Sequence, residues 1–508
     1  MMNNKPQLLI VLLFTSLLTS LFYKQFLGLN LFIAESAFFL WLAISKQIKF
    51  GERIQLITVL GFMLTGLFTV ITFSAFSIAS NFMAMLIFVG VLIYPETKSL
   101  ITAAKLSFLN AFSSQFRFLK EISNSKFIGN AAGKFIYKMS IIFIPLIIVF
   151  FFLIIYSVSN PIFDSFTYKI QRFIADNVWT LFKDLNYQLL FTFIFFLMLS
   201  NFLIMRTKST RYISSDQRAT DELTRTKQKS WINISLTSLK TEYKAAVFLF
   251  FCLNLILLLL NCIDVYWVWF NFEWEGQYLK QFVHEGTYLL ILSILISIAL
   301  VLYFFRKNLN FYTKNKTLKY LSYIWIAQNA ILTISVGIRN LYYIEYFNLA
   351  YKRIGVILFL ILTLYGLYSV FRKVRYKKSS FYILRTNAMA FYLVICISSI
   401  FNWDNIIAKY NFAHADRSFL HLNYMASLSD KSLPSLDKPL PDLLRIDSAQ
   451  NKLFPFEKIY LEPEEFYNRI QIRKEDFKIK WEQKNFLSWN WPEYEAYRIL
   501  FLSKSSEN

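Results

Sequence analysis

The sequence predicts an all-α fold: a polytopic membrane helix bundle of about 11 spans, followed by a small extracytoplasmic C-terminal domain. Three observations predict it. Of the 508 residues, 56% are hydrophobic and 17% are charged, whereas soluble domains are about 45–50% apolar and about 25% charged. Many apolar runs approach the roughly 20 residues that a helix needs to cross a bilayer. Basic residues gather between these runs, as expected for loops on the cytoplasmic side.

The apolar runs are expected to be the spans. The first follows Lys5 and reads LLIVLLFTSLLTSLF, which resembles a signal peptide. Because no clear small-residue cleavage signal follows, we interpret it as a retained first helix. Spans three and four are almost continuous along the chain. The expected spans are residues 7–23, 26–45, 54–76, 77–95, 139–158, 186–205, 245–268, 286–305, 320–338, 354–371 and 383–402.

Orientation follows from the connections between the spans. Every second connection is rich in Lys and Arg, and the alternate connections are short, balanced or acidic. Because basic loops remain in the cytoplasm, this alternation predicts the N-terminus inside and the C-terminus outside a bacterial cytoplasmic (inner) membrane. The basic connections lie at residues 46–53, 98–138, 206–244, 306–319 and 372–378.

The chain is expected to divide into residues 1–95 with four spans, the cytoplasmic amphipathic connection 96–138, the seven-span core 139–403 and the extracytoplasmic domain 404–508. In the connection, KSLITAAKLSFLNAFSSQFRFLKEI places apolar residues at helical spacing among basic ones. A helix of this kind either lies on an anionic membrane surface or packs against the bundle. The segment 162–185 is expected to be a second surface helix, with lipid contact and packing against the bundle again both open. In the tail, the prolines of LPSLDKPLPDLL predict a loop or a broken helix.

The net charge of +22 does not indicate nucleic-acid binding. The basic residues follow the loops, and the sequence has no helix-turn-helix, zinc-finger or RNA-recognition pattern. Membrane lipid is the expected partner, together with an envelope protein bound through the C-terminal domain. No cofactor or metal site is expected, because the three cysteines lie in apolar runs without ligand spacing. The sequence also lacks Walker A, GxSxG and HExxH motifs.

Three stretches resemble a bacterial family of polytopic membrane proteins described only as a domain of unknown function, of the four-one-five-three or four-one-seven-three type. They are EYKAAVFLFFCLNLILLLLNCIDVYWVW with QFVHEGTYLLILSILISIALVLYF, then SVGIRNLYYIEYFNLAYKRIGV, then NWDNIIAKYNFAHADRSFLHLNYMASLSDKSLPSL with LSWNWPEYEAYR near the end. The resemblance covers about the last 270 residues, and the first 200 match only as generic spans. It implies a membrane protein with this C-terminal arrangement and no particular mechanism.

Ionisable residues gather at the predicted outer ends of spans seven to nine. A charge inside a span costs roughly 2.5–3.5 kcal/mol on insertion scales, so such residues usually face each other or water. An ion pair between Asp264 and Arg339 is the first that we expect. The candidate polar site consists of Glu35, Asp264, His284, Glu285, Arg339, Glu345 and Arg353.

His284 and Glu285 stand directly before Gly286 and a long apolar run, and three interpretations are open. The pair starts span eight, where the helix dipole favours glutamate. Alternatively it responds to protons or to a ligand, since histidine titrates near pH ~6.5, or it serves general acid–base catalysis. A metal site would need more ligands. His414 and His421 are expected to be ordinary surface or interface residues.

Glu35 lies mid-span in NLFIAESAFFLW, with no charged residue nearby. We expect its side chain to face other helices, in either a functional or a structural role. No catalytic residue is assigned. The leading functional interpretation is a non-enzymatic envelope transporter or sensor-scaffold with an outer-leaflet polar cavity. The alternative is a membrane-embedded enzyme that acts on a lipid-linked envelope substrate at the outer face.

Overall fold

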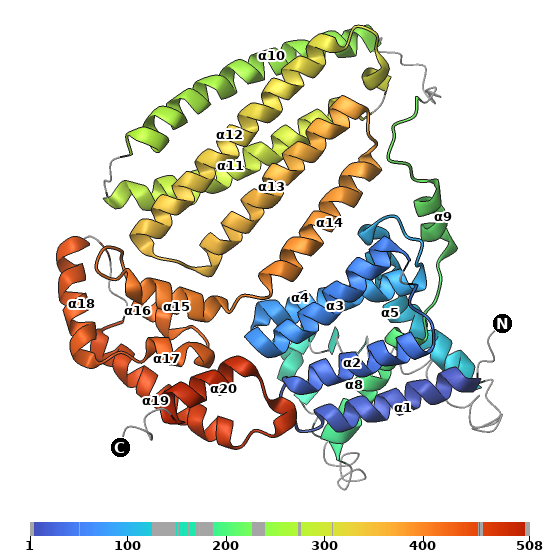
Figure 1. The fold of residues 1–508 in the computed structure, drawn as a ribbon, viewed down its shortest axis with the longest axis vertical. Helices are drawn as coiled ribbons and strands as arrows, with labels where there is room; N and C mark the ends of the chain where they lie inside the picture. The colour runs from blue at the N-terminus through green and yellow to red at the C-terminus, as the bar shows by residue number, and fades with distance from the viewer. Residues whose placement is uncertain are drawn as a thin grey trace.

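The structure is a computed structural model and is almost entirely helical (Figure 1). It describes residues 5–49, 51–123, 186–225, 239–272, 276–306, 308–455, 457 and 461–502, with scattered residues between 149 and 172. In this part of the chain the regular elements are helices, and Glu222 and Lys378 form one isolated bridge. The expected all-α class is therefore confirmed.

The N-terminal helix group lies at the lower right of Figure 1. Its packing depends on small residues: a Cβ atom at Gly90 would lie 1.9 Å from the Ala103 carbonyl oxygen, so α4 and α5 touch through their backbones. Phe38, Phe62 and Phe88 fill the core between the helices. Among the described residues, the group consists of α1 (Lys5–Phe22), α2 (Leu29–Ile44), α3 (Arg53–Thr72), α4 (Ala75–Ile93), α5 (Leu100–Ser123) and α8 (Tyr187–Ile204).

The break between α3 and α4 separates the two spans that are nearly continuous in the sequence. Phe73 ends α3 in the left-handed region, with φ of 40°. Ser74 then caps α4, because its side chain accepts a hydrogen bond from the Ser77 amide while the Ser77 hydroxyl accepts one from the Ser74 amide. This reciprocal cap satisfies amides that would otherwise lack partners and fixes the start of α4.

Helix α5 corresponds to the predicted amphipathic connection. One face, with Ala103, Leu106 and Phe118, is buried against the N-terminal helix group. The opposite face exposes Phe108 and Phe112. The helix therefore packs against the bundle and still presents an apolar stripe. The other expected amphipathic segment, 162–185, lies mostly outside the described residues.

The central helix group forms a layer of long helices that run side by side (Figure 1). Helix α14 also packs on the N-terminal helix group: a Cβ atom at Gly61 of α3 would lie 2.0 Å from the Tyr392 hydroxyl. Tyr392 is almost fully buried there, so α14 joins the two groups. The central group consists of α10 (Leu239–Asp264), which continues as a π-helical turn (Val265–Phe270), α11 (Gly276–Phe304), α12 (Lys316–Phe347), α13 (Tyr351–Tyr376) and α14 (Ser380–Ser398).

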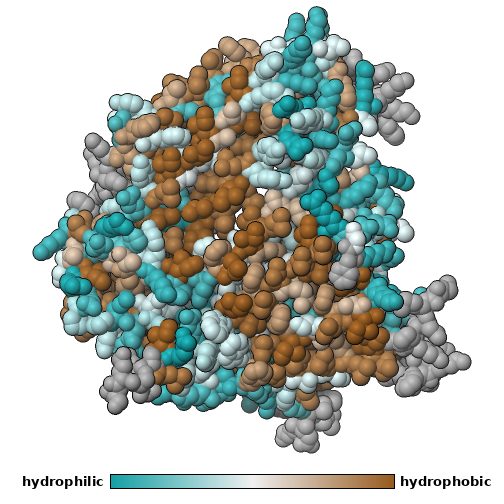
Figure 2. Space-filling view, viewed as in Figure 1, coloured by the Kyte–Doolittle hydropathy of each residue, from teal (hydrophilic) through white to brown (hydrophobic). Residues whose placement is uncertain are grey.

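The described helices include 8 that are long and apolar enough to cross a membrane, and α1 and α2 are shorter apolar helices. The expected span at 139–158 lies mostly outside the described residues. Figure 2 shows apolar side chains over the middle of both helix groups, with polar side chains beyond them at either end. Such a belt is what a bilayer requires of an integral membrane protein.

The C-terminal unit, residues 403–502, has a hydrophobic core of its own around Phe466, Ile407 and Leu433. Ile354 of α13 packs into the same core. The proline-rich stretch forms one four-residue helix and the beginning of a separate 14-residue helix, and the following acidic and basic segment is helical. The unit contains α15 (Trp403–Ala413), α16 (Leu422–Ala426), α17 (Leu433–Leu436), α18 (Leu440–Leu453), α19 (Pro463–Glu482) and α20 (Trp491–Tyr497).

Candidate functional site

A buried ion pair joins the end of α10 to α12. Arg339 Nη2 lies 2.5 Å from Asp264 Oδ1, and the Ser335 hydroxyl donates to Asp264 Oδ2 at 2.7 Å. Both charged side chains are about 95% buried. The pair expected from the sequence is therefore present. Each buried charge has the opposite charge beside it, and this offsets the free-energy cost of removing both ions from water.

Helix α11 approaches this ion pair through a glycine. A Cβ atom at Gly286 would lie 3.7 Å from Arg339 Nη1. The next residue, Thr287, is buried, and its hydroxyl has no hydrogen-bond partner among the described residues. A third helix thus passes within van der Waals contact of Arg339, and its next residue carries a buried hydroxyl without a described partner.

A small cavity of about 100 Å³ opens next to Thr287, between α11, α12 and α13. A water molecule occupies about 30 Å³ in the liquid, so the space suits a few waters or a small polar group. Lys352 and Arg353 make the lining positive. The other lining residues are Tyr288, Asn340, Tyr343, Ala350 and Val356.

Arg353, in the wall of this cavity, makes structural contacts with the end of α12. Its Nη1 donates to the Phe347 carbonyl at 2.8 Å and to the carbonyl of Asn348. Its guanidinium lies over the Tyr343 ring, 4.6 Å from the centroid. Asn348 has φ of 66° and ends α12. Arg353 therefore satisfies carbonyl groups that the end of α12 leaves without helical partners.

The predicted His284–Glu285 pair is not at a helix start, because α11 begins at Gly276 and both residues lie inside it. The expected helix start at this pair was therefore wrong, because the helix extends through the polar residues that precede the apolar run, whereas the apolar span itself begins at Gly286 as expected. The side chains of residues 276–285 are outside what the structure describes. Among the described residues, no three His, Cys, Asp or Glu side chains converge as metal ligands.

The two remaining predicted residues lie apart from the ion pair. Glu345 is exposed, and its backbone carbonyl accepts a 2.5 Å hydrogen bond from the Ser418 hydroxyl of the C-terminal unit. Glu35 lies on α2, in the other helix group, and is only 6% exposed. Its side chain faces other helices, as expected. The structure thus brings Asp264, Arg339 and Arg353 to one region and leaves both glutamates outside it.

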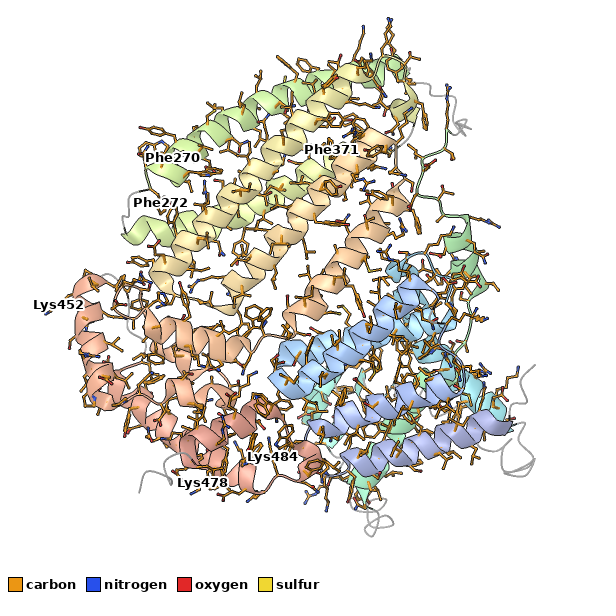
Figure 3. The ribbon with its side chains drawn as sticks, in the orientation of Figure 1. Phe270, Phe272, Phe371, Lys452, Lys478 and Lys484 are labelled. Carbon is orange, nitrogen blue, oxygen red and sulfur yellow. The ribbon has the colours of Figure 1, made fainter. Side chains whose placement is uncertain are left out.

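Sequence reasoning missed the polar contacts that attach the C-terminal unit to the helices. The Lys431 ammonium is buried under the α3–α4 turn, where it donates to the carbonyls of Thr72 and Phe73 at 3.1 and 3.0 Å. Asp404 Oδ2 lies 3.1 Å from the same nitrogen. Burial lowers the pKa of Lys431, and the neighbouring Asp404 carboxylate opposes that shift. Lys484 lies at the same junction (Figure 3), over the Phe73 ring.

Two further connections contact the C-terminal unit. At the α12–α13 turn, the Asn411 side chain accepts from the Leu349 amide at 2.8 Å and donates to its carbonyl at 3.0 Å. At the α1–α2 connection, the Leu29 amide donates to the Trp489 carbonyl at 2.8 Å. A Cβ atom at Gly28 would lie 2.5 Å from the Ser488 carbonyl carbon, so only glycine allows this approach. We call these three attachments the clamp.

The opposite end of the bundle is also tied across the two helix groups. Asp216, in α9 (Thr210–Arg218), accepts from the Lys98 amide at 2.8 Å and from the Thr102 hydroxyl at 2.7 Å, at the start of α5. Farther along the same connection, Asp221 pairs with Arg385 of α14. The connection 205–225 therefore links α5 to the central helix group at the end away from the C-terminal unit (Figure 1).

A family profile described as a domain of unknown function, DUF4153, matches residues 9–438. The match includes the first 200 residues, which the sequence resemblance treated only as generic spans, and it ends before LSWNWPEYEAYR. No curated protein and no solved structure matches the chain.

Proposed function

We propose that this chain, which belongs to the DUF4153 family, is a non-enzymatic sensor-scaffold of the bacterial cytoplasmic membrane that carries its C-terminal unit on the extracytoplasmic side. The clamp is the observation that carries the proposal. Lys431, Asn411 and Trp489 attach one compact unit to connections from both helix groups. A unit held in this way keeps a fixed position relative to the helices and can transmit a load or a ligand-induced shift to both groups.

The same observation disfavours the transporter version of the sequence interpretation. Alternating access rocks one bundle against another around a central site. Here the clamp ties the groups at one end, and Asp216 and Asp221 tie them at the other. Rocking would break the buried Lys431 hydrogen bond of the clamp at one end and the partly exposed Asp221–Arg385 pair at the other, which opposes such a motion.

The enzyme alternative needs an acid and a base that converge on one cavity. The described members of the predicted site do not supply such a pair. Asp264 is engaged with Arg339, Glu345 is exposed elsewhere, and Glu35 belongs to the other helix group. This separation favours the scaffold over the enzyme.

An envelope protein is the partner that we propose for the C-terminal unit, with membrane lipid around the helices. The unit exposes large apolar side chains that its own core does not use. Among the described residues these include Ile472, Ile479 and Phe486, which are 64%, 54% and 69% exposed. Ile472 and Ile479 lie seven residues apart in α19 and so share one face of that helix, and a shared apolar face exposed to water is typical of a protein contact site.

Distance measurements between spin labels on the two helix groups test the scaffold. One label pair, at Phe26 and Leu341, reports on the clamp end; a second, at Ile44 and Tyr376, reports on the other end. All four side chains are at least 50% exposed, so labels there are tolerated. The native cysteines would be replaced by serine.

A scaffold gives one narrow distance distribution for each pair in liposomes. Lys431→Met should broaden the Phe26–Leu341 distribution and leave the other unchanged, because only the clamp loses contacts. A transporter would instead give two distance distributions for each label pair, and the distance at one end would increase when the distance at the other end decreases.

A further inference from the structure

A second cavity, of about 350 Å³, lies inside the N-terminal helix group among α1, α2, α3, α4 and α8. Phe14, Leu18, Phe38 and Met85 are typical of its apolar lining. Glu35 and Asn81 are the polar residues of that lining. Pockets that bind small molecules measure roughly 300–1,000 Å³ and combine apolar walls with a few placed polar groups, and this cavity meets both conditions.

The Glu35 carboxyl has an unused hydrogen-bonding position. The residue is 6% exposed, and its Oε2 atom has no hydrogen-bond partner among the described residues. Asn81, beside it in the lining, interacts with the Glu35 carboxyl and also donates to the Thr65 hydroxyl at 3.4 Å, which leaves Oε2 as the oxygen without a partner. Gly66 makes room for the carboxyl, since a Cβ atom there would lie 1.9 Å from Oε2. Buried polar atoms are normally satisfied, so an unsatisfied oxygen on a cavity wall indicates a missing donor.

The cavity lining continues to the apolar outer surface of the bundle. Phe82 and Phe195 belong to the lining and are 54% and 64% exposed. In a membrane protein such a surface faces acyl chains, so an occupant reaches the cavity from the bilayer. Glu35 is six residues from Leu29, which is about 9 Å of helix. The carboxyl therefore lies a short distance below the helix end that the clamp holds.

We propose that this cavity binds the alkyl chain of a membrane amphiphile whose hydroxyl group hydrogen-bonds to Glu35. A carboxylate only accepts hydrogen bonds, whereas a carboxylic acid also donates one. A hydroxyl group donates and accepts, so it satisfies Glu35 in either protonation state. The apolar walls take the chain, as apolar cavities take hydrocarbon ligands. The site is separate from the clamp and does not depend on the scaffold role.

Photocrosslinking of the full chain in liposomes tests this site. The probe is a long-chain alcohol with a diazirine in its chain, and the comparison probe is the same chain without the hydroxyl. Labelled peptides are identified by mass spectrometry. We expect the alcohol to label peptides of α1, α2 and α8 that line the cavity. Ala34→Trp, which fills the cavity, should abolish this labelling, and Leu40→Trp, on the exposed face of the same helix, should preserve it.

Glu35→Leu separates hydrogen bonding from simple lipid contact. Labelling by the alcohol should fall about tenfold, which corresponds to one hydrogen bond of about 1.4 kcal/mol, whereas labelling by the hydrocarbon probe should be unchanged. Thermal stability in detergent checks that each variant folds; Glu35→Leu alone decides the matter if Ala34→Trp does not fold. Equal alcohol labelling of the wild type and Glu35→Leu would overturn the proposal, as would labelling spread evenly over all membrane-facing helices.

Discussion

Arg339 and Asp264 form a buried ion pair that fastens α12 to α10, with Ser335 completing the hydrogen bonds of the carboxylate. The two residues are 75 positions apart in the chain, and Gly286 of α11 lies close to Arg339. A pair of this kind is compensated electrostatically, so its contribution is to specify which helices pack together.

A double-mutant cycle tests the pair. Asp264→Asn or Arg339→Gln alone should lower the free energy of unfolding in detergent by about 3–5 kcal/mol, because each leaves an uncompensated buried charge. The double variant should lose less than the sum. The exposed pair of Asp442 and Arg445 is the control, since exposed pairs contribute about 0–1 kcal/mol. Additive losses at Asp264 and Arg339 would show that the two charges are not coupled.

A single methyl group tests the clamp at the α1–α2 connection. Gly28→Ala would place a Cβ atom 2.5 Å from the backbone of Ser488, and backbone atoms cannot move aside as a flexible side chain can. We expect a loss of about 1–3 kcal/mol and faster proteolysis of the C-terminal unit. Gly355→Ala, where a Cβ atom meets nothing within 4 Å, should do neither. Similar behaviour of both variants would mean that the unit does not contact this connection.

Lys431 gives the clamp a pH dependence. Because burial lowers its folded-state pKa below the ordinary value of 10.5, the unfolded chain binds more protons between these two values. The contribution of Lys431 to unfolding free energy must therefore rise with pH in that window. We expect the stability of the wild type relative to Lys431→Met to increase from neutral pH toward pH 10.5. A difference that falls over this range would contradict the burial of a charged lysine.

The Asp264–Arg339 contact could be predicted because few partners exist for a charge inside an apolar segment. Most helices could be predicted because their apolar runs are long enough to span a bilayer. Helix ends were less certain. The apolar run from Gly286 gave no sign that α11 begins at Gly276, since a helix continues through polar residues when nothing stops it.

The clamp could not be predicted, because each of its contacts involves a backbone amide or carbonyl far away in the chain. Lys431 and Thr72 are 359 positions apart, and a carbonyl oxygen has no sequence signature. The cavity beside Glu35 could not be predicted from the sequence either. The sequence shows an isolated carboxyl, but the unfilled space around it depends on how Gly66 and five helices come together.

Side-specific labelling tests the central claim, that the C-terminal unit is extracytoplasmic. Single cysteines would replace the exposed residues Lys480 in α19 and Arg211 in α9, with the native cysteines changed to serine. A membrane-impermeant maleimide is added to intact spheroplasts and, separately, to lysed ones. The alternation of basic loops predicts that Lys480→Cys is labelled in intact spheroplasts and that Arg211→Cys is labelled only after lysis. Labelling of Arg211→Cys in intact spheroplasts, with Lys480→Cys protected, would contradict the account.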